Sequence, residues 1–300
     1  MFKIAFSPLY AHPLPEGHRF PMLKYELIPK QLLYEGIIEE SNLFEPMPAA
    51  ESDILLTHDK NYFQNLKQLS LDPSHIRRIG FPLSKELVQR EICLIQGTLD
   101  CALYALEHGV SMNIAGGTHH AFAHKGEGFC LLNDIAFAAN VLLHRKLVQK
   151  ILVIDLDVHQ GNGTATIFKN NPQVFTFSMH GKDNYPFHKE KSDLDIPLEL
   201  GTTDAIYLDL LKNNLSTILD QENPDFIFYL CGVDVLATDK LGKLNLSELG
   251  CKERDLLVLG ACKQLKIPVA GAMGGGYSTK IADIVNAHCH TFKVAQKLFF

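Results

Sequence analysis

Short apolar runs alternate with longer segments of mixed polarity along most of this 300-residue chain. Six of these runs are nearly continuously apolar and are bounded by turn residues, which is typical of strands covered on both faces. The predicted strands are Lys3–Phe6, Ser111–Ala115, Lys150–Asp155, Val174–Ser178, Asp225–Leu230 and Ile267–Ala272.

The segments between these runs show helical periodicity. Apolar residues recur at steps of three and four over Val88–Leu106, and again over Leu208–Ile218, which follows the N-cap sequence Thr202–Asp204. Asn133–Asp134 is a second N-cap sequence, and the segment after it, Ile135–Leu147, is apolar on nearly all sides. We therefore expect three helices here, the last of them buried.

Alternation of strands and helices predicts parallel βαβ units. No Ser/Gly-rich linker, low-complexity tract or internal repeat divides the chain, and we interpret Pro46–Ser52 and Leu71–Ser84 as surface loops. The expected fold class is α/β: a single three-layer α/β/α domain over residues 1–300, with a central, mostly parallel sheet.

Composition excludes several classes of protein. Hydrophobic residues make up 46% and charged residues 21% of the chain, as in globular proteins, and the net charge is −6. No Lys/Arg cluster exceeds Arg77–Arg78, so we expect no direct contact with nucleic acid. No signal peptide or apolar stretch of membrane-spanning length is present, and the seven cysteines form no CxxC pair. These features predict a cytoplasmic protein that does not associate with membranes.

The strongest chemical signal follows the third predicted strand. Asp155, Asp157 and His159 are spaced by two, and Gly161 comes next. In an extended chain this spacing places Asp157 and His159 on one side, where together they could hold a cation. The alternative interpretation is a solvated turn in which one aspartate caps the next helix.

Three other strands end in polar groups. Gly116-Gly117-Thr118-His119-His120 follows one, Cys231-Gly232-Val233-Asp234 another, and Gly274-Gly275-Gly276-Tyr277 a third. Each segment alone is weak evidence. Ligands bind at the carboxyl ends of strands in open α/β sheets, so together the four segments predict one site.

The residue types in this site suit metal-assisted hydrolysis. Two aspartates and one histidine form a three-ligand set for a divalent ion, which lowers the pKa of bound water to about 7. The histidine pair could transfer a proton to a leaving amine, and Tyr277 could donate to an oxyanion. No Walker loop or GxGxxG follows a strand, so phosphoryl and hydride transfer are disfavoured.

These motifs resemble the zinc-dependent histone deacetylase family, which has the arginase/deacetylase fold. The likeness covers nearly the whole chain and extends to His12-Pro13, His18-Arg19, Gly126–Cys130 and Ser178–His180. The short N-terminal region and the segment Gly232–Gly242 are most similar to class IV members and their bacterial relatives.

The resemblance implies a role for each residue of the site. Zn²⁺, with Fe²⁺ as the alternative metal, would be held by Asp157, His159 and Asp234. Asp155 would support His119, Asn162 would support His120, and Tyr277 would polarise the acyl carbonyl.

Further roles are implied outside the metal site. The substrate tunnel would be formed by Gly128, Phe129, Tyr185 and Gly275, and the channel that releases acetate would contain Arg19. A structural K⁺ would be bound by the Ser178 hydroxyl and the backbone carbonyls of Asp155, Asp157, His159 and Met179.

The sequence also departs from some members of the family. Class I members have an aspartate where this chain has Asn162, and Leu71–Ser84 contains no counterpart of the aspartate that holds the substrate backbone. Gly161 replaces the aspartate that a second metal needs in the arginase branch, which favours a single metal.

The implied function is hydrolysis of the acyl-lysine amide in a protein or peptide. Alternatives within the same chemistry are a long-chain fatty-acyl-lysine deacylase and an amidohydrolase of acetylpolyamines or other small acyl-amines. A different class is an acyl-lysine binding protein without catalysis. Which histidine acts as general base is left open.

Overall fold

A computed structural model describes residues 1–300, and its centre is one sheet of eight parallel strands in the order β2-β1-β3-β8-β7-β4-β5-β6. The strands are β1 (Lys3–Ala5), β2 (Leu43–Phe44), β3 (Val110–Asn113), β4 (Ile151–Asp155), β5 (Val174–Gly181), β6 (Leu194–Leu198), β7 (Phe226–Leu230) and β8 (Val269–Ala272). Strands β3, β4, β7 and β8 are buried throughout, which explains why β4, β7 and β8 are almost entirely apolar. In β3 the buried Ser111 and Asn113 donate to backbone carbonyls.

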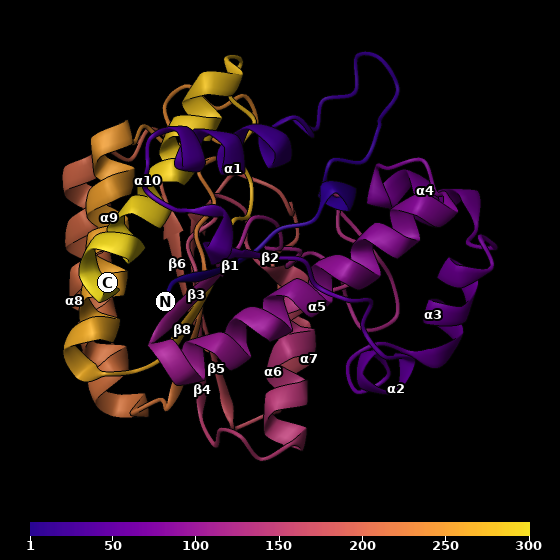
Figure 1. The fold of residues 1–300 in the computed structure, drawn as a ribbon, viewed down its shortest axis with the longest axis horizontal. Helices are drawn as coiled ribbons and strands as arrows, with labels where there is room; N and C mark the ends of the chain where they lie inside the picture. Colours follow the sequence, from indigo (N-terminus) through magenta and orange to yellow (C-terminus); the bar gives the residue numbers. More distant parts are fainter.

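Helices cover both faces of the sheet, which confirms the predicted three-layer arrangement (Figure 1). One layer contains α8 (Asp204–Glu222), α9 (Glu248–Leu265) and α10 (Ile281–Phe299), with α1 (Lys24–Tyr34) against α10. The other contains α5 (Lys85–His108), α6 (Asp134–His144) and α7 (Asn162–Phe168). A single cluster of 80 buried apolar residues joins the sheet to both layers. No helix is both long enough and apolar enough to span a membrane.

All six predicted strands and the three predicted helices are present. The two strands that the pattern missed, β2 and β6, lie at the edges of the sheet. An edge strand pairs on one side only and can be short or partly polar. Strand β2 has only two residues, and β6 is half-exposed and contains Pro197, which an edge strand tolerates.

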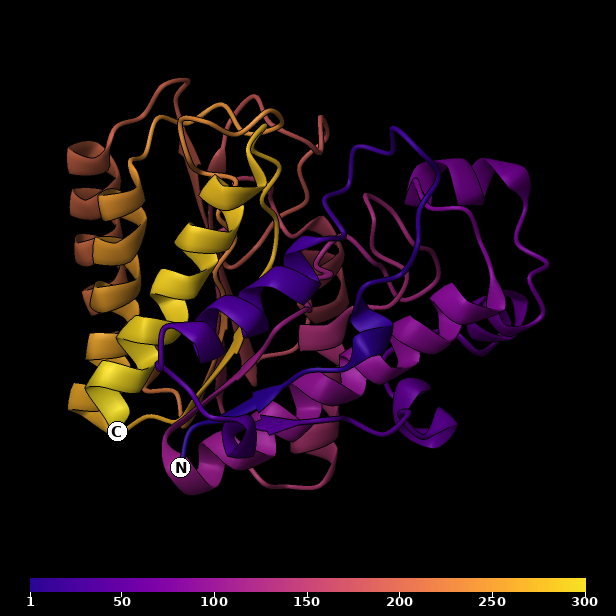
Figure 2. The ribbon, with the colours of Figure 1, turned by 45° about the horizontal axis from the view of Figure 1, so that its top comes forward.

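The interpretation of two segments as surface loops is wrong in part. Leu71–Ser84 contains α4 (Pro73–Ile79), and the last two residues of Pro46–Ser52 begin α2 (Glu51–Ile54). With α3 (Lys60–Lys67), these helices form a lobe beyond α5 (Figure 2). Pro73 at the first helical position and Gly80, left-handed at φ 84°, are the start and stop signals of α4.

Candidate active site

The metal-ligand candidates converge from two adjacent strands. Asp157 and His159 follow β4, and Asp234 follows β7, which pairs directly with β4. All three side chains are buried, and their potential ligand atoms lie within 4.8 Å of one another. His159 Nδ1 is 3.0 Å from Asp157 Oδ1 and 3.1 Å from Asp234 Oδ2.

The backbone holds the two carboxylates in place. The N–H of Gly275 donates to Asp157 Oδ2 at 2.8 Å, and the N–H of Val158 donates to Asp234 Oδ1 at 2.9 Å. Gly275 must be glycine for this approach, because a Cβ there would lie 2.0 Å from Asp234 Oδ2. The residue therefore contacts the metal-ligand candidates, and it lines the inner cavity together with Gly128 and Phe129, two of the other residues implied for the tunnel.

The electrostatics of this cluster fit a cation. Burial and the charge of Asp157 raise the pKa of Asp234 to about 7. Burial lowers the pKa of His159, but the two carboxylates outweigh it and raise that pKa to about 10. Two buried carboxylates at this separation need a positive charge between them. An Asp-His-Asp donor set that leaves coordination positions open suits a divalent ion such as Zn²⁺.

The histidine pair that follows β3 has two different supporting partners. His119 Nδ1 lies 2.7 Å from Asp155 Oδ2, and His120 Nδ1 lies 2.7 Å from Asn162 Oδ1. The two rings are 4.1 Å apart between centroids. Burial opposes charge on both, but the Asp155 carboxylate raises the pKa of His119 above its usual value. Burial and the neighbouring imidazoles lower the pKa of His120 well below its usual value.

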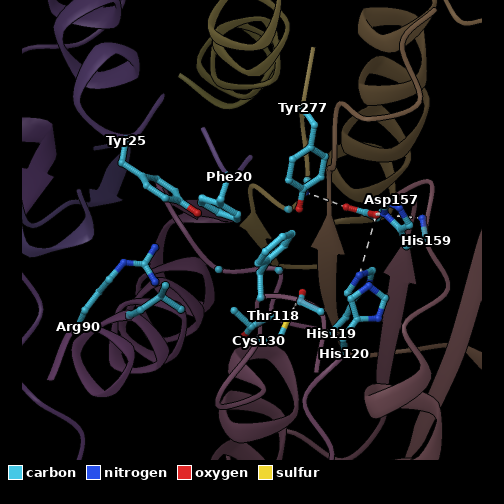
Figure 3. A pocket seen from close by; sticks show the side chains of 17 residues that line it. Phe20, Tyr25, Arg90, Thr118, His119, His120, Cys130, Asp157, His159 and Tyr277 are labelled. Atoms are coloured by element: carbon cyan, nitrogen blue, oxygen red, sulfur yellow. Dashed lines mark hydrogen bonds and ion pairs between the residues drawn. The ribbon is translucent and has the colours of Figure 1, made fainter. Parts of the chain in front are cut away.

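Tyr277 stands above this cluster at the end of the glycine-rich segment that follows β8 (Figure 3). Its N–H donates to Asp239 Oδ2 at 2.5 Å, and its ring centroid is 6.4 Å from that of His159. Burial and the charges of Asp234 and Asp157 raise the pKa of its hydroxyl well above 10. The side chain therefore remains a hydrogen-bond donor across the physiological pH range.

A tunnel wall leads from this cluster to the surface. Gly128, Phe129, Tyr185 and Tyr277 line an outer hollow of about 380 Å³, whose inner end is formed by His120 and His159. The Tyr185 ring meets His120 edge-on at 4.9 Å, and its hydroxyl donates to Glu127. Sequence reasoning missed Glu127, which also accepts from Asn162 Nδ2 at 3.3 Å and so connects the tunnel wall to the support of His120.

A second, smaller cavity of about 40 Å³ continues inward from the metal-ligand candidates. Its walls include Phe20, Tyr25, Leu94 and Arg90, and in Figure 3 Arg90 lies at the end far from His159. Arg90 is buried, and its guanidinium donates to the carbonyl of Tyr10 at 2.8 Å and to the carboxylate of Glu91.

The position implied for Arg19 is therefore wrong. Arg19 is exposed, lines the outer hollow, and has its guanidinium carbon 5.0 Å from the centroid of the Phe129 ring. The inner arginine is Arg90 on α5. The helical pattern alone gave no signal for its role. Buried Lys24, whose Nζ donates to the carbonyl of Gly274 at 2.9 Å, was also missed.

The residues implied for a K⁺ site also lie together. Ser178 and Met179 are buried on β5, where Ser178 pairs in register with Asp155 on β4. The Ser178 hydroxyl is 3.0 Å from Nδ1 of His180.

The architecture and the site together define an α/β fold of the arginase/deacetylase type with a candidate metal centre at the carboxyl edge of its sheet. The fold agrees with two solved structures. A histone deacetylase homologue complexed with SAHA superposes with a TM-score of 0.85 at 24% identity, covering 99% of this chain and 84% of the other. A homologue from Aquifex aeolicus gives 0.83 at 23% identity, covering 98% and 84%.

Sequence comparison identifies the family. The model of the histone deacetylase domain matches residues 18–292. An uncharacterized protein of Picosynechococcus sp. is 44% identical, with 99% of both chains covered. Histone deacetylase 2 of Arabidopsis thaliana is 32% identical, with 89% of this chain and 72% of the relative covered. The chain belongs to the histone deacetylase family, as the resemblance of its motifs had led us to expect.

Proposed function

We propose that this protein hydrolyses the amide bond of acyl-lysine and that its preferred acyl group is short. The observation that carries the proposal is the convergence of buried Asp157, His159 and Asp234 with two histidines whose supporting partners differ in charge. Membership of the histone deacetylase family supports a hydrolase that acts on acetyl-lysine amides.

Asp157, His159 and Asp234 would hold Zn²⁺, or Fe²⁺ as the alternative. When bound, such an ion supplies an activated water and a Lewis acid for the acyl carbonyl. Side chains of the protein then transfer the protons and stabilise the charges of the reaction. His120, neutral because its pKa is low, is suited to take a proton from the attacking water and to return it to the leaving amine. The Asp155 carboxylate raises the pKa of His119, so His119 is the better suited of the two histidines to carry a positive charge beside the reacting atoms.

Tyr277 would donate its hydroxyl hydrogen bond to the carbonyl oxygen as negative charge develops there. Because the group lies on a buried segment fixed by Asp239, little reorganisation accompanies the reaction. The acyl-lysine side chain would occupy the tunnel between Phe129 and Tyr185.

The inner cavity supports a short acyl group. Its volume of about 40 Å³ has room for about one to three water molecules. An acetyl methyl group fits such a space, whereas an octanoyl or myristoyl chain requires Phe20, Tyr25 or Leu94 to move. This observation favours a deacetylase over the long-chain deacylase considered from the sequence.

The direct test is hydrolysis of acetyl-, octanoyl- and myristoyl-lysine peptides and of acetylated polyamines by zinc-loaded protein, with Asp234→Ala as control. We expect turnover of the acetyl peptide and its loss in the control. Turnover of the myristoyl peptide alone would refute the short-acyl proposal. Saturable binding without product from any substrate would instead indicate a binding protein.

The Ser178 hydroxyl and the carbonyls of Asp155, Asp157, His159 and Met179 would hold K⁺ next to the metal ligands. The support is that Ser178 is buried beside Asp155 in the register of β4 and β5. Thermal unfolding in KCl and in NaCl of equal ionic strength tests this, because K⁺ should raise the melting temperature more than Na⁺.

A further inference from the structure

The entrance of the tunnel is positively charged, although the chain as a whole carries a net charge of −6. Three cationic side chains, Arg19, Arg78 and Lys243, line the outer hollow, and Asp183 is the one acidic residue among its lining residues. All three cations are exposed, and none forms an ion pair with a carboxylate of the chain.

Two of these cations lie on one side of the tunnel entrance and the third lies on the other. The Arg19 guanidinium lies 5.0 Å from the centroid of the Phe129 ring. The carbonyl of Arg78 accepts the N–H of Gly128 at 3.0 Å, which places Arg78 beside the same segment. On the opposite wall, Lys243 Nζ donates to the carbonyl of Asp183 at 3.1 Å, two residues before Tyr185. The three cations therefore surround the entrance.

The exposed carboxylate of Asp183 offsets one of these three charges, so the outer hollow keeps an excess of positive charge. Two other nearby carboxylates have partners elsewhere. Glu127, behind the tunnel wall, is largely buried, accepts from the Tyr185 hydroxyl and lies 3.5 Å from Lys125 Nζ. Asp239 accepts the backbone N–H groups of Leu241, Gly242 and Tyr277. A substrate that enters the tunnel thus meets unpaired cations first.

The same entrance presents one large exposed aromatic side chain. Phe187 is 85% exposed and packs edge-on against Tyr185, with 6.4 Å between the ring centroids. Exposed aromatic rings bordered by charged groups are typical of surfaces that contact another protein. A small acyl-amine that fills only the tunnel would leave this ring uncovered.

We propose that the entrance selects acyl-lysine within acidic peptide segments and disfavours polycationic substrates such as acetylpolyamines or Lys/Arg-rich tails. This inference rests on the proposed function. The lysine side chain spans the tunnel, so the residues next to the acyl-lysine lie at the entrance, within reach of Arg19, Arg78 and Lys243. Charges of one sign at a cleft also raise the association rate of ligands of the opposite sign.

The test measures kcat/KM of the full-length, metal-loaded protein on three acetyl-lysine peptides of equal length. Their flanking residues are Asp/Glu, Ala/Ser or Lys/Arg. We expect the acidic peptide to exceed the basic one by about 5- to 50-fold at low ionic strength and the ratio to shrink in about 0.5 M salt. Nε-acetyl-lysine with a free carboxylate serves as a further substrate, and its preference over the acidic peptide would overturn the assignment to a peptide.

The matched variants carry the same change in net charge. In Arg19→Gln/Arg78→Gln/Lys243→Gln, the ratio of acidic to basic kcat/KM should approach one. In the control Lys60→Gln/Lys212→Gln/Lys297→Gln, whose exposed lysines are outside the outer hollow, the ratio should stay as in the wild type. Equal kcat/KM for the acidic and basic peptides would overturn this inference, and so would a preference for the acidic peptide that persists in Arg19→Gln/Arg78→Gln/Lys243→Gln. Either result would leave the proposed function intact. Absence of turnover on every peptide would overturn the proposed function itself.

Discussion

Replacing Asn162 by aspartate changes one neutral group beside a histidine into a charged one. In the structure the Asn162 Oδ1 oxygen lies 2.7 Å from His120 Nδ1, and both side chains are buried. The substitution keeps the shape of the side chain and the hydrogen bond to the imidazole. It adds a negative charge that favours the protonated form, so the pKa of His120 should rise.

The size of this rise follows from the distance. With an effective dielectric constant of about 20, unit charges about 4 Å apart interact by ~4 kcal/mol, equivalent to ~3 pKa units. Glu127 makes the expected rise in the pKa of His120 smaller, because its carboxylate accepts from the Asn162 amide and would repel the new aspartate. We therefore expect a rise of about 1–3 units in the pKa of His120.

The assay is the pH dependence of kcat/KM on an acetyl-lysine peptide. If neutral His120 is the general base, activity falls as the pH drops through its pKa in the free enzyme. This fall is the acidic limb of the pH profile, and a raised pKa of His120 moves the limb to higher pH. Asn213→Asp on the exposed face of α8 adds the same charge far from the site and should leave the limb unchanged. An unmoved limb in Asn162→Asp, or one displaced to lower pH, would refute the assignment of His120 as base.

Three further expectations address the oxyanion donor, the metal-ligand candidates and the core. Tyr277→Phe should lower kcat about 10²–10³-fold in steady-state assays, with an unchanged melting temperature, and equal activity would remove its assigned role. Gly275→Ala should weaken zinc retention about 10–100-fold in competition with a chelator, because its Cβ would meet Asp234 Oδ2 at 2.0 Å. Gly260→Ala, where a Cβ meets nothing within 4 Å, is the control and should retain zinc like the wild type. Arg254→Ala should lower the free energy of unfolding in urea by about 3–5 kcal/mol, because Asp255, also fully buried, loses its partner at 2.8 Å; a loss below 1 kcal/mol would contradict this.

The strands and the segments that follow them could be predicted because both signals are local. A parallel strand buried on both faces is mostly apolar, so β4, β7 and β8 are visible in the sequence as short apolar runs. Parallel strands share one carboxyl edge, so motifs up to about 160 residues apart in sequence converge without any further information. This is how His119, Asp157, Asp234 and Tyr277 were expected in one site.

Edge strands, the inner arginine and the charge at the entrance could not be predicted in this way. Strand β6 is half-exposed and carries no continuous apolar run. Arg19 lies in a segment without periodicity, and its side chain packs over Phe129 at the entrance. Arg90 belongs to a helix whose apolar pattern does not reveal that its guanidinium reaches the inner cavity.

The sequence by itself determined the fold class, the family and the residues that gather at the carboxyl edge of the sheet. Only the tertiary structure decided how those residues differ from one another. His119 and His120 are adjacent in the sequence, yet a carboxylate raises the pKa of one, and burial with neighbouring imidazoles lowers that of the other. The size of the inner cavity and the ring of cations at the entrance likewise depend on side chains from separate elements. Electrostatic energies and cavity volumes depend on distances in space, and the tertiary packing of the chain sets those distances.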